Sequence, residues 1–248
     1  MSSFRLESWS AIAPGMESSD DWRAWLAQPV AIDEPMGKVD LSAIPAMLRR
    51  RFNRLGKCAM AAAMPLVTHT ANIPSIFASR HGDTELSVSL LESIGRREAM
   101  SPTSFSLAVH NAVSGLFSIA RKDTSEITAI AAMRGLVLQT LFEAIGQLQT
   151  SDRLLCVIYD IPLPEFYRLT CHENGDSFPY AIAMVLNRDH GDICQLEYEQ
   201  TDLPGQTAQG FPIDKDAVML LRLLTGLDEQ VSFCSNGSRW NFSRKSAC

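Results

Sequence analysis

The segment LLCVIYD at positions 154–160 constrains the fold most, because apolar or aromatic side chains fill it up to its final aspartate. A strand without alternating polar residues is typical of the middle of a sheet that is covered on both faces. Short apolar runs at 73–80 and 126–133 suit further strands, and the second run is rich in β-branched residues. The chain therefore needs a sheet with helices packed against it.

Helical patterns separate these strands. The other expected strands are 4–14, 180–188, 193–200 and 238–244, and the expected helices are 20–27, 43–64, 85–97, 101–120, 135–148 and 216–226. The strands at 180–188 and 193–200 would form an antiparallel hairpin through the turn DHGD, and Pro65 would end or kink the helix at 43–64. This order predicts an α/β fold, a layered mixed sheet with helices on its faces, in a single domain that spans 1–248.

The charge balance excludes one class of partner. Lys and Arg number 22 against 28 Asp and Glu, so the net charge is -6, which argues against a nucleic-acid surface. A local exception is the basic run of Arg49, Arg50, Arg51 and Arg54. This run suits either a solvated helix face or contact with an acidic carrier protein.

The sequence predicts a cytoplasmic protein with no cofactor and no metal. The N-terminus lacks the apolar core of a signal peptide, and the longest apolar stretch, 59–67, is too short to span a membrane. The six cysteines have no C-x-x-C pairing, and no two of the five histidines have metal-ligand spacing. A Gly-rich phosphate loop and a G-x-S-x-G turn are both missing from the sequence.

The motif SRHGDT at 79–84 leaves one catalytic hypothesis open. Arg80-His81-Gly82 after an apolar strand resembles the phosphate-binding start of the histidine phosphatases, in which the histidine is phosphorylated and the arginine neutralises the phosphoryl oxygens. In that family the motif follows the first strand, whereas a long segment precedes it here. The alternative is structural, with Arg80 and His81 paired to carboxylates at a strand end.

A second resemblance covers more of the chain. The stretch 101–148, SPTSFSLAVHNAVSGLFSIARKDTSEITAIAAMRGLVLQTLFEAIGQL, resembles the N-terminal half of the β-ketoacyl synthases of the thiolase fold. That half has a dimer-interface helix with a Ser-Pro start, a buried strand, the turn with the nucleophilic cysteine and a long helix. Aligned on Gly135, the cysteine position is Ala132, whose methyl group has no nucleophilic atom. The resemblance therefore implies a chain with no catalytic residue of its own.

Other segments extend this resemblance. SWSAIAPGM is similar to the first strand and turn of the fold, and IFASRHGDTELSVSLLESI to a gating strand and loop. The sequence contexts of the two catalytic histidines, which belong to the C-terminal half of a complete synthase, do not occur. The phrases FASRHGD, SPTSFSLAVHNAVSG and YDIPLP resemble the chain-length factors of type II polyketide synthases, including the shortened ones of aryl polyene pigment synthesis.

The resemblance implies a partner and a shared tunnel. The partner is an active ketosynthase, in a heterodimer or a heterotetramer, and the substrate is an acyl chain on an acyl carrier protein. A half-fold would also leave one face of its sheet uncovered. The residues expected to line the tunnel and set chain length are Arg80, His81, Thr84, Phe105, Ala108 and Met133. Those expected at the dimer interface are Pro102, Val109, Asn111, Ala112, Gly115, Ile127, Ala129 and Arg134. A stand-alone acyl-binding or scaffold module is the remaining alternative.

Overall fold

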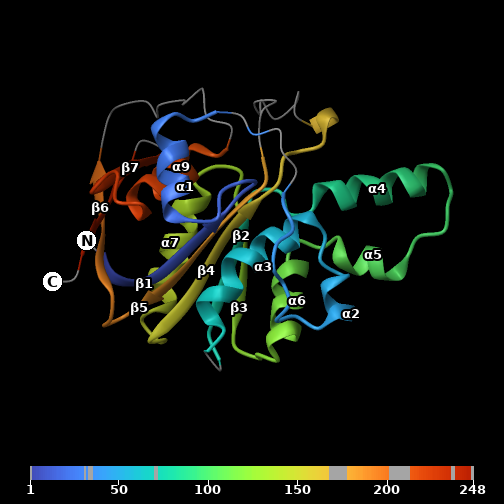
Figure 1. Cartoon of the computed structure of the whole chain (residues 1–248), viewed down its shortest axis with the longest axis horizontal. Coiled ribbons are helices and arrows are strands. Elements are labelled where there is room, and N and C mark those ends of the chain that lie inside the picture. The colour runs from blue at the N-terminus through green and yellow to red at the C-terminus, as the bar shows by residue number, and fades with distance from the viewer. Residues whose placement is uncertain are drawn as a thin grey trace.

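The computed structural model describes residues 2–30, 32, 36–69, 72–167, 178–200, 213–235 and 238–246. Eight strands form one mixed sheet in the order β3-β2-β4-β5-β1-β6-β8-β7 (Figure 1). The strands are β1 (Ser2–Ile12), β2 (Ser75–Ser79), β3 (Ile127–Ala131), β4 (Arg153–Asp160), β5 (Tyr180–Asn187), β6 (Asp192–Gln200), β7 (Gln230–Ser235) and β8 (Ser238–Lys245). β2 pairs in parallel with β3 and β4, and the remaining pairs are antiparallel.

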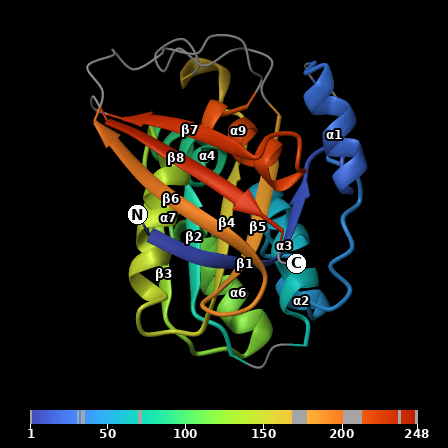
Figure 2. The same cartoon turned by 90° about the vertical axis from the view of Figure 1, so that its left-hand side faces the viewer.

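Helices cover both faces of the centre of the sheet. The helices are α1 (Ser19–Ala27), α2 (Ala46–Arg49), α3 (Arg54–Val67), α4 (Thr84–Gly95), α5 (Pro102–Leu107), α6 (Ala112–Arg121), α7 (Leu136–Gln147) and α9 (Lys215–Leu224). The hydrophobic core on one face includes α1, α7 and α9, and the core on the other face includes α3 and α6. Figure 2 shows the sheet between α7 on one side and α3 on the other.

Alternate residues of β4 enter the two cores. Leu154, Cys156 and Ile158 belong to the core of α7 and α9, whereas Leu155 and Val157 belong to that of α3. The wholly apolar LLCVIYD is thus a central strand buried on both faces, as expected. The expectation that a half-fold leaves one face of its sheet uncovered is wrong for the centre of this sheet, because α3 of the same chain packs on the second face.

The expected hairpin of β5 and β6 does not form. β1 lies between these two strands and pairs antiparallel with both of them. Gly191, in the connecting turn, has φ +114, and a Cβ there would collide with the Leu6 carbonyl of β1. The short DHGD connection therefore crosses over β1 at Leu6 and Glu7 instead of closing a hairpin, which local sequence cannot reveal.

Two of the expected helices are each divided in two. The helix expected at 43–64 becomes α2 and α3, because the Asn53 side chain caps α3 by accepting from Gly56 N at 2.9 Å. Pro65 lies inside α3, which continues to Val67. The helix expected at 101–120 becomes α5 and α6, although Ser101 and Pro102 do begin α5 as N-cap and first residue.

The segment 84–110 and the strand β3 form the outer part of the molecule. α4 and α5 extend away from the sheet (Figure 1), and neither contains a buried residue. β3 is the edge strand and is only partly buried, so the expectation of a buried strand at 126–133 is wrong for the chain alone. Strand β7 was not expected from the sequence.

Candidate functional site

The carboxyl ends of β2 and β4 meet in a buried polar cluster. Asp160 Oδ1 accepts from Ser79 Oγ and from Arg80 N, both at 3.0 Å. Asp160 Oδ2 accepts from Arg80 Nε at 2.8 Å and from the Tyr180 hydroxyl at 3.5 Å. The Asp160 side chain is 2% exposed and that of Arg80 13%, so water screens this ion pair little. The pair anchors the chain where it leaves β2.

The SRHG turn is held against the segment between α5 and α6. Gly82 adopts φ +61 and donates its N–H to Ser79 Oγ at 2.9 Å. The ring of His110 packs over Gly82, and its Nε2 lies 3.0 Å from the Ser79 carbonyl oxygen, which places the proton on Nε2. This tertiary bond turns His110 inward and explains why the helix expected at 101–120 is interrupted.

The beginning of α4 carries two unsatisfied polar atoms. The Asp83 side chain caps the helix by accepting from Leu86 N at 3.0 Å through Oδ1. Asp83 Oδ2 and Thr84 Oγ1 are buried without a hydrogen-bond partner among the described residues. Burial raises the pKa of the Asp83 carboxyl.

A tight turn joins β3 to α7 at the same edge of the sheet. Ala131, the last residue of β3, pairs with Ser79, so Ala132 follows directly beside the end of β2. Gly135 adopts φ +66 at the N-cap of α7. Ala132 is half-buried against the core of α7, whereas Met133 and Arg134 are exposed. This is the strand, turn and helix order that the resemblance implied around the cysteine position.

The six residues expected to line a tunnel lie in three places. Arg80 and His81 follow β2, and Thr84 begins α4. Phe105 lies on α5 and is 62% exposed, and Ala108 follows that helix. Met133 lies in the turn after β3. The side chain of Arg80 is tied to the buried cluster by the bond to Asp160.

The residues expected at a dimer interface lie along the outer part of the molecule. Asn111, Gly115, Ile127 and Ala129 line one groove of about 480 Å³ between α6 and the edge strand β3. Pro102 and Val109 are exposed on and after α5, Ala112 begins α6 half-buried, and Arg134 is exposed. Asn111 and Gly115 do share a face, although Asn111 is the N-cap residue of α6 and not part of a longer helix.

Sequence reasoning gave Asp160 no role, although a signal was present. A carboxylate that ends a wholly apolar strand must be paired when it is buried. The prediction that Arg80 pairs with a carboxylate at a strand end is confirmed. The phosphatase hypothesis loses support, because Arg80 Nε, which would face a phosphoryl group, is bonded to Asp160.

The described residues show neither a metal cluster nor a membrane-spanning helix. They contain no group of three or more His, Cys, Asp or Glu side chains placed to hold a metal ion. Of the helices in the described ranges, none has the length and apolar character needed to cross a membrane.

Comparison with known proteins gives the family. The family model described as "Beta-ketoacyl synthase, N-terminal domain" matches residues 22–243. No curated protein matches the chain by sequence.

Among solved structures, the chain is similar to one in the complex of a ketosynthase with its chain length factor from Xenorhabdus doucetiae. The TM-score is 0.81 at 24% identity, over 98% of this chain and 100% of that one. The ishigamide ketosynthase/chain length factor gives a TM-score of 0.63 at 13% identity, over 82% of this chain and 68% of that one. A beta-ketoacyl synthase from Burkholderia phymatum gives 0.61 at 10% identity, over 92% and 71%. The fold is thus that of the thiolase-like ketosynthases, and the chain belongs to the β-ketoacyl synthase N-terminal domain family.

Proposed function

We propose that this chain is a non-catalytic chain-length-factor subunit that pairs with an active β-ketoacyl synthase and shapes the acyl tunnel at their interface. One observation carries the proposal. Among the described residues, seven of the twelve large hydrophobic side chains that are exposed lie between Leu91 and Met133. The seven are Leu91, Ile94, Met100, Phe105, Val109, Ile119 and Met133. We interpret this concentration of exposed apolar side chains in one part of the chain as the surface that the partner covers.

The open edge of the sheet lies in the same part of the chain. β3 pairs with β2 alone among the described strands, so its other side presents unpaired backbone groups. Small side chains at Gly115 and Ala129 border the groove beside it. A partner strand and helix that fit there would continue the sheet and bury the apolar side chains, at about 25 cal/mol per Å² of apolar area.

The proposed lack of catalysis rests on Ala132. In the family, the turn between the strand and the long helix carries the cysteine that forms the acyl thioester. Ala132 lies in this turn between β3 and α7. In our proposal, the partner supplies the cysteine and both histidines for condensation of an acyl chain with a malonyl unit on an acyl carrier protein.

The proposed role in chain length is steric. Phe105, Ala108 and Met133, with Arg80, His81 and Thr84 behind them, would form the far wall of a tunnel that the partner completes. A growing chain that meets this wall must either stop or force side chains apart, which costs about 1–3 kcal/mol in a packed environment. The similar structures support this role, since two of them contain a ketosynthase and a chain length factor.

Co-expression with a neighbouring ketosynthase tests the pairing. We expect stoichiometric co-elution in size-exclusion chromatography with light scattering, as a heterodimer or as two joined heterodimers. Val109→Asp should abolish it, because a charge would replace an apolar contact. Leu227→Asp is the matched control, since Leu227 is similarly exposed but lies after α9. A well-behaved monomer that ignores the ketosynthase would instead favour a stand-alone acyl-binding or scaffold module.

Product analysis of the purified pair tests the tunnel wall. Ala108→Trp should shorten the acyl product while leaving co-elution intact, because the added ring fills space at the end of the tunnel. Leu227→Trp is the control for the size of the substitution. Unchanged product length with Ala108→Trp would remove Ala108 from the wall.

We further place this complex in the cytoplasm and treat 1–248 as a single domain. The cysteines at 58, 156, 194 and 234 are free, and such thiols persist in a reducing compartment.

A further inference from the structure

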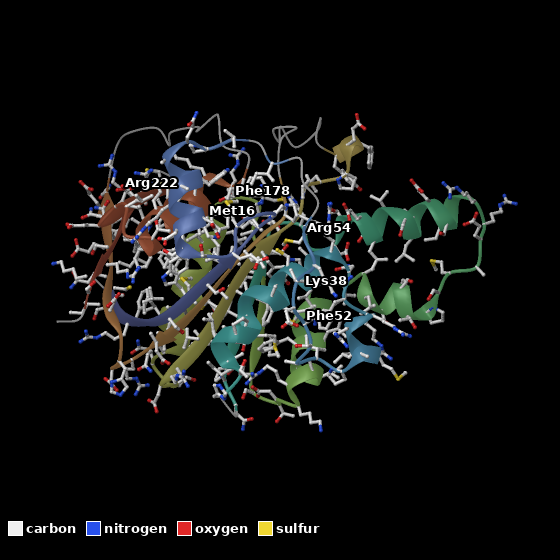
Figure 3. All side chains as sticks on the ribbon, viewed as in Figure 1. Met16, Lys38, Phe52, Arg54, Phe178 and Arg222 are labelled. Atoms are coloured by element: carbon white, nitrogen blue, oxygen red, sulfur yellow. The ribbon has the colours of Figure 1, made fainter. Side chains whose placement is uncertain are left out.

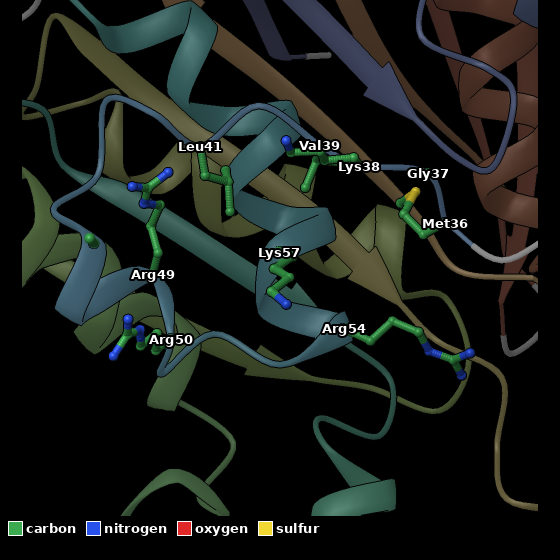
Figure 4. Close-up of a pocket in the computed structure, with 10 residues that line it drawn as sticks. Met36, Gly37, Lys38, Val39, Leu41, Arg49, Arg50, Arg54 and Lys57 are labelled. Carbon is green, nitrogen blue, oxygen red and sulfur yellow. The ribbon is translucent and has the colours of Figure 1, made fainter.

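A basic cavity lies where the segment 36–41 passes the beginning of α3 (Figure 4). Its volume is about 620 Å³. Figure 3 places Lys38, Phe52 and Arg54 together on the side of the molecule near α4 and α5, away from Met16 and Arg222. The cationic side chains that line the cavity are Lys38, Arg49, Arg50, Arg54 and Lys57, and its apolar lining is Met36, Val39, Leu41 and Ala46.

The charge of the side chains that line the cavity is opposite in sign to the net charge of the protein. The chain carries a net charge of -6, yet no carboxylate is among the described residues that line this cavity. Arg54 Nη2 binds Glu85 Oε1 at 2.6 Å, and in Figure 4 its side chain extends away from Arg49 and Arg50. Lys38, Arg49, Arg50 and Lys57 form no hydrogen bond or ion pair with their side chains to any described residue.

One carboxylate balances part of this charge. Hydrogen bonds from Ser42 lower the pKa of the Asp40 carboxyl, and Arg49 and Lys38 lower it further. Asp40 is therefore an anion beside the cavity, but it is fully exposed and does not line it. Several cations therefore line one cavity without a carboxylate of the described residues bound to them. Such a set attracts a ligand with more than one negative charge.

The apolar lining sets a second requirement for a ligand, which must cover apolar side chains as well as carry negative charge. Leu41 is buried in the core of α3, and Met36 and Val39 pack against the same core. The volume is in the range of small-molecule pockets, about 300–1,000 Å³. A convex acidic protein surface would meet the exposed cations and leave this concave apolar lining uncovered, whereas a small amphiphile satisfies both.

We propose that this cavity binds a phosphate ester with an aliphatic chain. The phosphate dianion would lie among Arg49, Arg50 and Lys57, because guanidinium groups bind phosphate oxygens in pairs. The chain would cover Val39 and Leu41. This inference goes beyond the proposed function and does not depend on it, since none of these residues belongs to the proposed tunnel or subunit interface.

Isothermal titration calorimetry on the full chain, in complex with the ketosynthase where the two co-purify, tests the site. The probes are n-octyl phosphate, inorganic phosphate and the uncharged n-octyl glucoside, in a phosphate-free buffer. We expect n-octyl phosphate to bind most tightly. The double variant Arg50→Gln/Lys57→Gln should bind it about tenfold more weakly or worse, because two charge-assisted contacts are lost. Lys245→Gln, at the end of β8, is the matched control and should leave its affinity unchanged.

A second variant separates the two halves of the site. Val39→Asn should weaken n-octyl phosphate but not inorganic phosphate, and circular dichroism checks that each variant is folded. Equal binding of n-octyl glucoside, or equal loss of affinity in the Lys245→Gln variant, would overturn the proposal. So would failure of n-octyl phosphate to bind while an acidic carrier protein binds through Arg50 and Lys57, since the surface would then be a protein-docking site.

Discussion

Apolar side chains are covered at the centre of the sheet and left exposed in the outer segment, which comprises 84–110 and the edge strand β3. β4 and β5 are buried on both faces by helices of the same chain. α4 and α5 contain no buried residue, and β3 forms an open edge. β4 and β5 are more apolar in sequence than the outer segment, yet that segment carries many large apolar side chains that its own chain leaves exposed. The difference agrees with our proposal that another molecule covers the outer segment.

The largest expected effect is a loss of stability from a substitution in the centre, compared with a substitution in the outer segment. Phe77 is fully buried, with ring centroids 5.0 Å from Phe117 and 6.0 Å from Tyr159. Phe77→Ala should lower the free energy of unfolding by about 3–5 kcal/mol through lost burial and a cavity. Phe105→Ala is the matched control, because Phe105 is 62% exposed, and its effect should stay within about 0.5 kcal/mol.

Denaturant unfolding of the isolated chain measures both variants. If Phe105→Ala cost as much as Phe77→Ala, the outer segment would be part of the cooperative core. In the complex, Phe105→Ala should instead weaken partner binding or alter product length.

The next effect concerns the ion pair at the junction of the two regions. Asp160→Ala leaves the largely buried Arg80 guanidinium without its carboxylate, which should cost about 3 kcal/mol. The double variant Arg80→Met/Asp160→Leu should recover most of this loss, because it removes both charges and fills the space. Thermal melts of the three proteins check the sign. An Asp160→Ala variant as stable as the parent would show that water or another anion replaces Asp160.

The smallest effect is a pH dependence within the centre. Burial, and then the neighbouring Asp214, raise the pKa of Asp216 in the first turn of α9 to about 6, from 3.8. The folded state therefore holds this proton more tightly than the unfolded state, and stability falls as the pH rises from 3.8 through about 6.

Asp216→Asn should remove that fall. Its melting temperature should exceed that of the parent by about 2–4 °C at pH 8, the shift given by about 1 kcal/mol, and match it near pH 4. A constant difference at both pH values would mean that another group titrates. A stabilising interaction of the charge with the N-terminus of α9 opposes this effect and limits its size.

The sequence predicted which segments form strands better than it predicted which strands pair with one another. Each expected strand exists, because runs of β-branched and apolar residues favour extended backbone wherever they are placed. The pairing of β1 between β5 and β6 was missed, since it joins residues far apart in the chain. The breaks at Asn53 and at 108–111 were missed because a cap and the bond of His110 to Ser79 outweigh helix propensity.

The same distinction applies to the candidate site, of which one part could be located from the sequence and the other could not. The turn with Ala132 could be located from the sequence, because the strand, turn and helix that define it are contiguous. The cluster around Asp160 and the basic cavity could not, since they bring together residues from separate elements.

The sequence by itself determined that this chain forms a layered α/β sheet, belongs to a ketosynthase-like family and has alanine at position 132. The tertiary structure alone decided which apolar segments are covered. Burial depends on what packs against a segment: helices of the same chain bury β4 on both faces, whereas α4 and α5 contain no buried residue and β3 lies at an edge of the sheet. A sequence records how apolar a segment is, whereas the fold determines whether its own chain or another molecule covers it.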